Sequence, residues 1–323
     1  MKRLSGLLTI AALIGLLLIP GLLHGQAPRR LRIAIQPGIG YAHLIVMREL
    51  KMLEKQIPGL QVEWLRLTSG PVIRDAMLAG QVDIGSGGVG PFIIAWDRGV
   101  KWKIVSALNQ MPLYLNTNRD GVRTIKDLTQ SDKIAMPAVG SIQHVVLQMA
   151  AEKELGNPLA LDQLIVAMSH PDGMFALISK REITGHLTSP PFQYLELQIT
   201  GIRKVLDSYQ VLGGPHTFNL VWAMEDFPRR NPEVYQAFLR AVDEATAYLI
   251  DHRDDAARIL AESENTQPGF MRALLRNPEL QYTTTPHRLM QFAGFLKKTN
   301  QIKQAPASWK EFAFENMHRL PGD

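Results

Sequence analysis

The segment from Pro71 to Phe92 constrains the fold of this chain most strongly, because it carries the marks of a helix, a strand and a second helix. Pro71 suits the first position of a helix, where its missing N–H needs no partner. Gly80 suits the left-handed residue after a helix end. Residues 82–84 predict a short strand, and the glycines up to Gly90 predict a loop into the next helix. This order of elements favours an α/β fold.

The two helix starts predicted near Gly70 and Gly90 would carry unpaired N–H groups and a partial positive charge. Helix ends of this kind bind anions readily. The alternative is that the glycines only allow a tight turn from strand to helix. The segment is therefore a candidate for one half of an anion site.

Strands alternate with helices through the first two thirds of the chain. The predicted strands cover residues 30–36, 61–67, 103–108, 133–136, 164–168 and 205–209, and the predicted helices cover 41–55, 142–155 and 171–178. Such alternation predicts a mostly parallel sheet with helices on its faces. From Asn231 onward the pattern is helical, and Ser308 and Glu311 form a capping box that opens a last helix.

The segment 171–192 repeats the order of elements in the segment 71–92. A short helix from Pro171 is followed by residues 182–186, and Ser189-Pro-Pro-Phe192 stands where Gly90-Pro-Phe92 stood. This repetition indicates two related α/β lobes around a cleft, with chance similarity as the alternative. We assign residues 30–110 and 220–323 to lobe 1 and residues 111–219 to lobe 2.

The first 25 residues have the features of a secretory signal peptide. Lys2 and Arg3 precede an apolar run over residues 7–18, and Pro20 and Gly21 break the run before a predicted cleavage after Gly25. An uncleaved membrane anchor is the alternative. Since no other apolar stretch has the ~18–20 residues that a spanning helix needs, we expect a soluble, exported protein.

The absence of cysteine excludes disulfides, thiol catalysis, iron–sulfur clusters and a lipid anchor on an N-terminal cysteine. The formal charge is +5, and the loss of Lys2 and Arg3 with the signal peptide would leave +3. Basic residues are scattered, so nucleic-acid binding is not expected. The histidines lack metal-ligand spacing, so neither a metal site nor a cofactor is predicted.

Residues 85–90 match the G-x-G-x-x-G pattern of dinucleotide sites. The match does not lie on the first strand, and the strand 103–108 ends at Asn109-Gln110 without the acidic residue that would hold a ribose. We therefore interpret the pattern as unrelated to a dinucleotide. Asp83 invites a catalytic role, but between two apolar residues it is expected to bond backbone groups instead.

The sequence Ala76-Met-Leu-Ala-Gly-Gln-Val-Asp-Ile-Gly85 resembles a signature of periplasmic substrate-binding proteins from the nitrate/sulfonate/taurine group of ABC transporters. Ile125-Lys-Asp-Leu128 resembles the entry to the second lobe in that family, although Thr129-Gln130 replaces its usual Gly-Lys. Gly140-Ser141 and the segment 302–309 are also similar. The resemblance covers about residues 30–315.

The resemblance implies an α/β type II periplasmic-binding fold, with two lobes joined by two crossover strands that close on a solute. The family's ligand-contacting loops match segments of this chain that supply neutral donors and backbone N–H groups, a set suited to a singly charged oxyanion. The residues so implicated are Gly40, Tyr41, Ser69, Gly70, Ser86, Gly87, Gly88, Gly140, Ser141, Gln143, His144 and Ser189.

The resemblance also implies a function. The chain would capture a small anionic solute, such as a sulfonate, taurine, nitrate or a carboxylate, in the periplasm. It would act as a monomer and deliver the solute to the permease and ATPase of an ABC importer. A sensor that docks on a membrane receptor is an alternative. Enzymes of this fold that resemble the family depend on cysteine, so a cysteine-independent enzyme is a more remote alternative and no catalytic residue is predicted.

Overall fold

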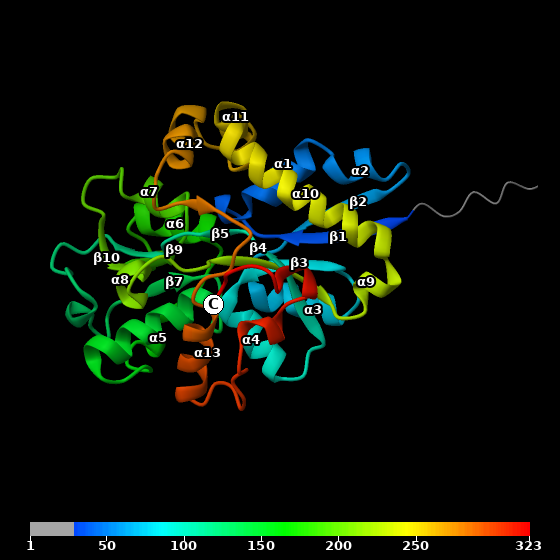
Figure 1. The fold of residues 1–323 in the computed structure, drawn as a ribbon. Helices are drawn as coiled ribbons and strands as arrows, with labels where there is room; N and C mark the ends of the chain where they lie inside the picture. The colour runs from blue at the N-terminus through cyan, green and yellow to red at the C-terminus, as the bar shows by residue number, and fades with distance from the viewer. Residues whose placement is uncertain (1–28) are drawn as a thin grey trace, which may run out of the picture.

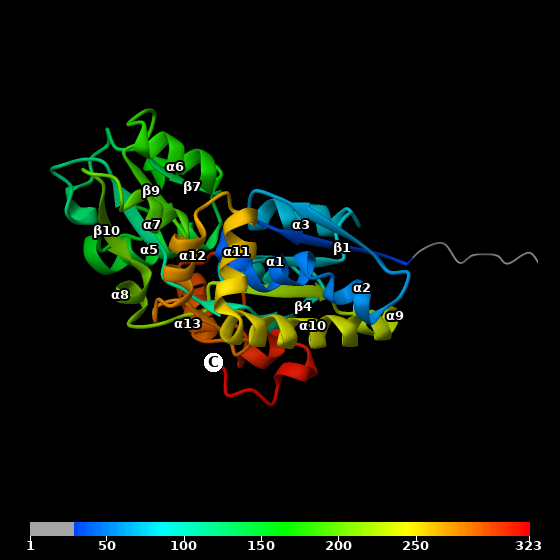
Figure 2. The same cartoon turned by 90° about the horizontal axis from the view of Figure 1, so that it is seen from above.

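The computed structural model describes residues 29–323, so the predicted signal peptide lies outside the described residues. Two five-stranded sheets lie side by side (Figures 1 and 2). The larger has the order β2-β1-β3-β11-β4. Its strands are β1 (Arg30–Ile35), β2 (Gln61–Arg66), β3 (Ile84–Gly88), β4 (Trp102–Ala107) and β11 (Asn219–Met224). β1 runs parallel to β2 and β3, whereas β11 runs antiparallel to β3 and β4.

The second sheet has the order β10-β6-β9-β7-β8. It consists of β6 (Tyr114–Thr117), β7 (Ile134–Met136), β8 (Ile165–Ala167), β9 (Gly185–Thr188) and β10 (Arg203–Asp207). β7 pairs in parallel with β8 and β9, and β6 pairs antiparallel with β9 and β10. The helices that follow β7, β8, β9 and β10 are, in that order, α5 (Ile142–Leu155), α6 (His170–Ile178), α7 (Phe192–Glu196) and α8 (Ser208–Leu212).

Two segments cross between the sheets. The first leaves β4 through β5 (Asn109–Gln110) and reaches β6, and the second returns through Thr217 to β11. They touch in an antiparallel bridge between Gln110 and Thr217, and β12 (Gln281–Tyr282) pairs with β5. The expected pair of crossing segments is thus present, while the division into lobes at residues 110 and 220 stays a prediction.

The elements around the larger sheet include the helices α1 (Ala42–Glu49), α2 (Met52–Gln56), α3 (Gly70–Leu78) and α4 (Val89–Asp97). The carboxy-terminal helices are α9 (Phe227–Arg230), α10 (Pro232–Asp251), α11 (Arg253–Ser263), α12 (Pro268–Leu275) and α13 (Leu289–Lys298). α10 packs against α1 and α2, and α13 contacts both α4 and α5 (Figure 1). Because α4 follows β3 and α5 follows β7, α13 rests on helices of both sheets.

The glycine loop predicted after Ile84 is wrong, because residues 84–88 form the buried strand β3 at the centre of the larger sheet. A Cβ atom on Gly85 would lie 2.6 Å from the Trp222 ring, and one on Gly87 would lie 3.1 Å from it. The glycines therefore make room for an indole from the neighbouring strand β11. Only the end of this segment, at Gly88, turns into a helix.

Two other boundaries differ from the prediction. The expected helix over residues 41–55 is interrupted at Lys51, which adopts a left-handed conformation with φ of 49° between α1 and α2. The capping box of Ser308 and Glu311 is present, but it opens one short 3-10 turn (Trp309–Phe312) rather than a longer helix. Among residues 29–323, no helix has the length and apolar character needed to cross a membrane.

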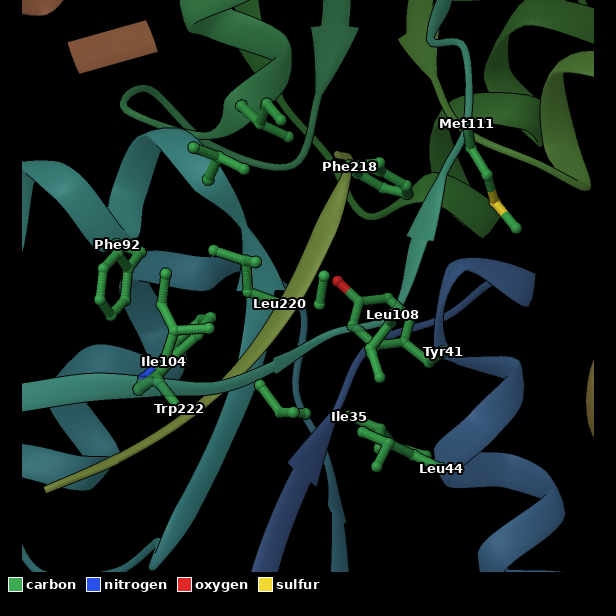
Figure 3. Packing of buried hydrophobic residues seen from close by; sticks show 14 of the residues in the cluster. Ile35, Tyr41, Leu44, Phe92, Ile104, Leu108, Met111, Phe218, Leu220 and Trp222 are labelled. Atoms are coloured by element: carbon green, nitrogen blue, oxygen red, sulfur yellow. The ribbon is translucent and has the colours of Figure 1, made fainter. Parts of the chain in front are cut away.

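The core of the larger sheet contains a group of aromatic side chains, of which Figure 3 labels Phe92 and Trp222. The Trp222 ring lies 5.3 Å from the Trp102 ring and 5.6 Å from the Phe92 ring, measured between centroids. Phe92 in turn meets Phe312 edge to face at 5.9 Å. β4, β11, α4 and the carboxy-terminal 3-10 turn are thereby held in one core.

His43 on α1 makes the stability of the fold sensitive to acid. Its side chain is fully buried, neither ring nitrogen has a hydrogen-bond partner within residues 29–323, and burial lowers its pKa to about 3. The folded chain therefore keeps His43 neutral while the unfolded chain binds a proton below pH ~6.5. This difference destabilises the fold as the pH falls from about 6.5 towards 3.

We expect His43 alone to remove about 2 kcal/mol of unfolding free energy between pH 7 and pH 5. His43→Leu lacks the titrating ring, so between pH 7 and pH 5 it should lose about 2 kcal/mol less unfolding free energy than the unmodified chain does. Urea unfolding at the two pH values measures the difference. His252→Gln, which removes an exposed histidine, is measured alongside as a control. Equal pH dependence of His43→Leu and the unmodified chain would contradict the argument.

Candidate functional site

A small cavity lies where the two sheets face each other. It is lined by Tyr41, Gly70 and Gly88 from the larger sheet's side and by Ser141, Gln143 and Ser189 from the other. The centre of a water-sized sphere can occupy about 10 Å³ of this cavity. The cavity therefore has room for about one water molecule. The two sides are thus closed on each other, and an organic solute can enter only when they move apart and then close around it.

Four helices of eight residues or more begin at this cavity. Gly70 and Gly88 stand at the starts of α3 and α4, Ser141 caps α5, and His170 is the first residue of α6. α3 and α4 have no side-chain hydrogen bond to their first N–H groups. Since helix starts carry partial positive charge and free N–H groups, the cavity suits an anion.

The polar groups on the cavity wall are uncharged amides, hydroxyls and one imidazole. Among residues 29–323, the cavity lining includes no lysine, arginine, aspartate or glutamate. Burial raises the pKa of the Tyr41 hydroxyl, so it stays protonated. A wall of this kind can neutralise one negative charge through helix starts, but it offers no full positive charge for a second one.

Six of the twelve residues predicted for the site line this cavity, namely Tyr41, Gly70, Gly88, Ser141, Gln143 and Ser189. They come from five separate segments on both sides of the cavity. Gly40, Ser69 and Gly87 neighbour lining residues without lining the cavity themselves. A Cβ atom added to Gly40 would lie 2.7 Å from the Phe218 ring. Ser69 is the residue before α3.

The remaining three predicted residues are bonded within their own sides of the molecule. Ser86 donates its hydroxyl to the Ala34 carbonyl at 2.6 Å inside the sheet. His144 accepts a hydrogen bond from the Gly140 N–H at 3.0 Å and contacts Asp162 at 3.2 Å. The Ser86 hydroxyl, the Gly140 N–H and the His144 ring are thus engaged with neighbouring groups, and the three residues do not line the cavity.

Sequence reasoning did not select seven lining residues, which are Gln36, Pro37, Pro91, Pro137, Ile142, His170 and Phe218. Gln36 had a usable signal, because it is the polar residue that ends the first predicted strand. His170 gave none, since its partners are distant in sequence. Asp83, outside the cavity, accepts hydrogen bonds from the backbone and guanidinium of Arg32 at 2.8–3.0 Å, as expected for a structural carboxylate.

No group of three or more histidine, aspartate or glutamate side chains within residues 29–323 is placed to hold a metal ion. The cavity offers hydrogen bonds from neutral side chains and from helix starts.

Comparison with known families and proteins adds to this geometry. A family model described as NMT1-like matches residues 24–263. A protein of Escherichia coli (strain K12) named for aliphatic sulfonate binding is 24% identical over 242 residues, which is 74% of this chain and 72% of that protein.

Two solved structures share the architecture. The alkanesulfonate-binding protein SsuA from Xanthomonas axonopodis pv. citri bound to MOPS superposes with a TM-score of 0.71 at 17% identity, over 87% of this chain and 96% of that one. The periplasmic nitrate-binding protein NrtA from Synechocystis PCC 6803 gives a TM-score of 0.70 at 15% identity, over 90% and 87%. The predicted α/β fold of periplasmic binding proteins is thereby confirmed.

Proposed function

Since the chain belongs to the NMT1-like family, we propose that it is the solute-binding component of an ABC importer and captures a small organic monoanion of the sulfonate class. The convergence of four helix starts on a cavity walled by uncharged donors carries this proposal. The names of the relative and of the two solved structures, which refer to aliphatic sulfonates, alkanesulfonate and nitrate, support the same class of solute.

The proposal includes the predicted location and partners. The signal-peptide features of residues 1–25 and the periplasmic nitrate-binding neighbour support capture of the solute in the periplasm. Delivery would then require a membrane permease and an ATPase. The two crossing segments that meet at Gln110 and Thr217 allow the hinge motion that this role requires.

The solute class is tested by thermal unfolding of the purified mature chain with taurine, methanesulfonate, butanesulfonate, nitrate, acetate and sulfate. A bound monoanion at ~100 times its dissociation constant should add about 2.7 kcal/mol to the unfolding free energy. Sulfate, with two charges, should add less than the sulfonates. Phosphate or Tris buffers are required, because sulfonate buffers such as MOPS would compete.

The cation choline serves as the negative control in this series. If none of these six solutes raises the unfolding temperature, or if choline raises it as much as a sulfonate does, the proposed function is wrong.

A further inference from the structure

A chain of three buried ionisable side chains runs from the second sheet to the cavity. Nδ1 of His186 lies 2.5 Å from Oε1 of Glu196, and Nε2 of His186 lies 3.3 Å from Nδ1 of His170. His186 and Glu196 are fully buried, and His170 is 5% exposed. Nε2 of His170 contacts the Gln143 amide at 3.1 Å, where both residues line the cavity.

The surroundings of this chain are neutral. Glu196 also accepts a hydrogen bond from Asn116 at 2.8 Å, and the Thr188 hydroxyl lies 2.9 Å from Nδ1 of His170. The Phe192 ring stacks on the His170 ring. Within residues 29–323, no lysine or arginine hydrogen-bonds with the three side chains. Of the titratable groups in the first turns of α5 and α6, His144 on α5 contacts Asp162, and Asp172 on α6 accepts a hydrogen bond from Ser169.

Two arrangements of protons make a hydrogen bond between His170 and His186 while Glu196 stays ionised. With Glu196 ionised and both histidines neutral, Nδ1–H of His186 donates to Glu196 and Nδ1–H of His170 donates to His186. Nε2 of His170 is then a bare acceptor, which the Gln143 amide can satisfy. One added proton makes His186 cationic, so that Nε2–H of His186 donates to His170. The His170 proton then sits on Nε2, at the cavity.

The two arrangements differ in charge and in what they offer to a ligand. The first arrangement carries the net negative charge of Glu196 in a buried site, and this charge repels an anion at the cavity. It also presents the lone pair on Nε2 of His170, which cannot form a hydrogen bond with an anion. The second is neutral overall and presents an N–H donor. An anionic ligand therefore favours the second arrangement.

We propose that the Glu196–His186–His170 chain couples anion binding to the uptake of one proton, which converts Nε2 of His170 from an acceptor into a donor that faces the ligand. This inference rests on the proposed function, because it concerns the same cavity. The coupling would make the site specific for singly charged anions that accept a hydrogen bond from His170.

The His170 ring itself stays uncharged in both arrangements, and its burial accounts for this. Burial, together with the neighbouring His186, holds the pKa of His170 well below its usual range, so that His170 is neutral at pH 7 without ligand. A bound anion favours the arrangement with the added proton, because the anion attracts the positive charge on His186 and accepts a hydrogen bond from Nε2–H of His170. The affinity should therefore rise as the pH falls.

Isothermal titration calorimetry of the mature chain with butanesulfonate tests the inference, in phosphate, imidazole and Tris buffers of the same pH. The dependence of the binding enthalpy on buffer ionisation enthalpy gives the number of protons taken up. Butanesulfonate itself stays a monoanion throughout. We expect about one proton per ligand at pH 7.5, and a dissociation constant that rises about tenfold per pH unit between pH 7 and pH 8.5.

Glu196→Gln provides the sharper test. The Asn116 amide donates both to Glu196 and to the Gln193 carbonyl, so the new side chain should turn its oxygen to Asn116 and its NH₂ group to His186. That orientation places the His170 proton on Nε2 without any added proton. This variant should bind butanesulfonate with no proton uptake and with an affinity independent of pH. His43→Leu, which removes another buried histidine, is the matched control and should keep the uptake of one proton.

The outcomes separate the two proposals. Binding by the unmodified chain without proton uptake, or continued uptake in Glu196→Gln, overturns the coupling and leaves the proposed function standing. Failure of the whole anion panel to bind overturns the proposed function and the coupling with it. Ring ¹⁵N chemical shifts of His170, recorded with and without butanesulfonate, should show Nε2 gaining a proton, and an unchanged Nε2 signal would also overturn the coupling.

Discussion

Gly88→Ala is expected to weaken solute binding about 10- to 100-fold while leaving the ligand-free fold stable. Gly88 ends β3 at the cavity, where a Cβ atom would lie 2.5 Å from Cγ2 and 2.6 Å from Cβ of Ile142. Because Ile142 is the first residue of α5, on the other side of the cavity, the added methyl group obstructs closure. Without ligand the two sides can separate and relieve the contact, so the cost falls on the closed, bound state.

Calorimetric titration with butanesulfonate, combined with thermal unfolding of the ligand-free protein, separates these two effects. Gly294→Ala is the matched control, because this glycine lies within α13 with nothing within 4 Å of its Cβ position. The control should bind normally and gain up to about 1 kcal/mol of stability from better helix propensity. Normal affinity in Gly88→Ala would show that closure at Ile142 does not govern binding.

Trp222→Ala is expected to lower the unfolding free energy by about 3–5 kcal/mol, the largest stability effect that we predict. The indole lies at the centre of the larger sheet, fills the space above Gly85 and Gly87, and donates its N–H to the Met77 sulfur at 3.1 Å. The glycines opposite the indole have no side chains that could fill the resulting cavity.

Urea unfolding followed by circular dichroism measures this loss. Trp64→Ala on the edge strand β2 is the control, because Trp64 is only partly buried and should cost less than half as much. A loss below about 1 kcal/mol in Trp222→Ala would contradict the role given to the indole.

The local elements of this fold were predictable from the sequence because their causes are local. The periodic apolar residues of α5, with Ser141 before it and Gly156 after it, predict a helix whose bounds the structure reproduces. The alternating residues of β1 and β2 likewise predict strands close to those observed. Both signals arise from backbone geometry and capping within a few neighbouring residues.

The prediction failed for residues 85–88, where composition and tertiary packing disagree. Four glycine and serine residues in a row favour a loop by propensity, yet they form the central strand β3. Trp222 pairs with Gly85 across the sheet, and Ser86 donates its hydroxyl to the Ala34 carbonyl. These partners lie far away in the sequence, so no local pattern reveals them.

The candidate site shows the same division. Sequence resemblance selected six of the lining residues, because motif positions at helix starts keep their place in the fold. It did not select His170, whose part in the proposed coupling depends on His186 and Glu196.

The sequence by itself determined the α/β class, most of the helices and strands, and the helix starts that favour an anion. The tertiary structure alone decided which of those helix starts meet at one cavity, that the glycines lie beneath Trp222, and that Glu196, His186 and His170 form a buried chain. The physical reason is the distance along the chain over which each effect acts. Propensity, capping and periodicity act over a few residues, whereas burial and the charge of a buried group are set by side chains that only the complete fold brings together.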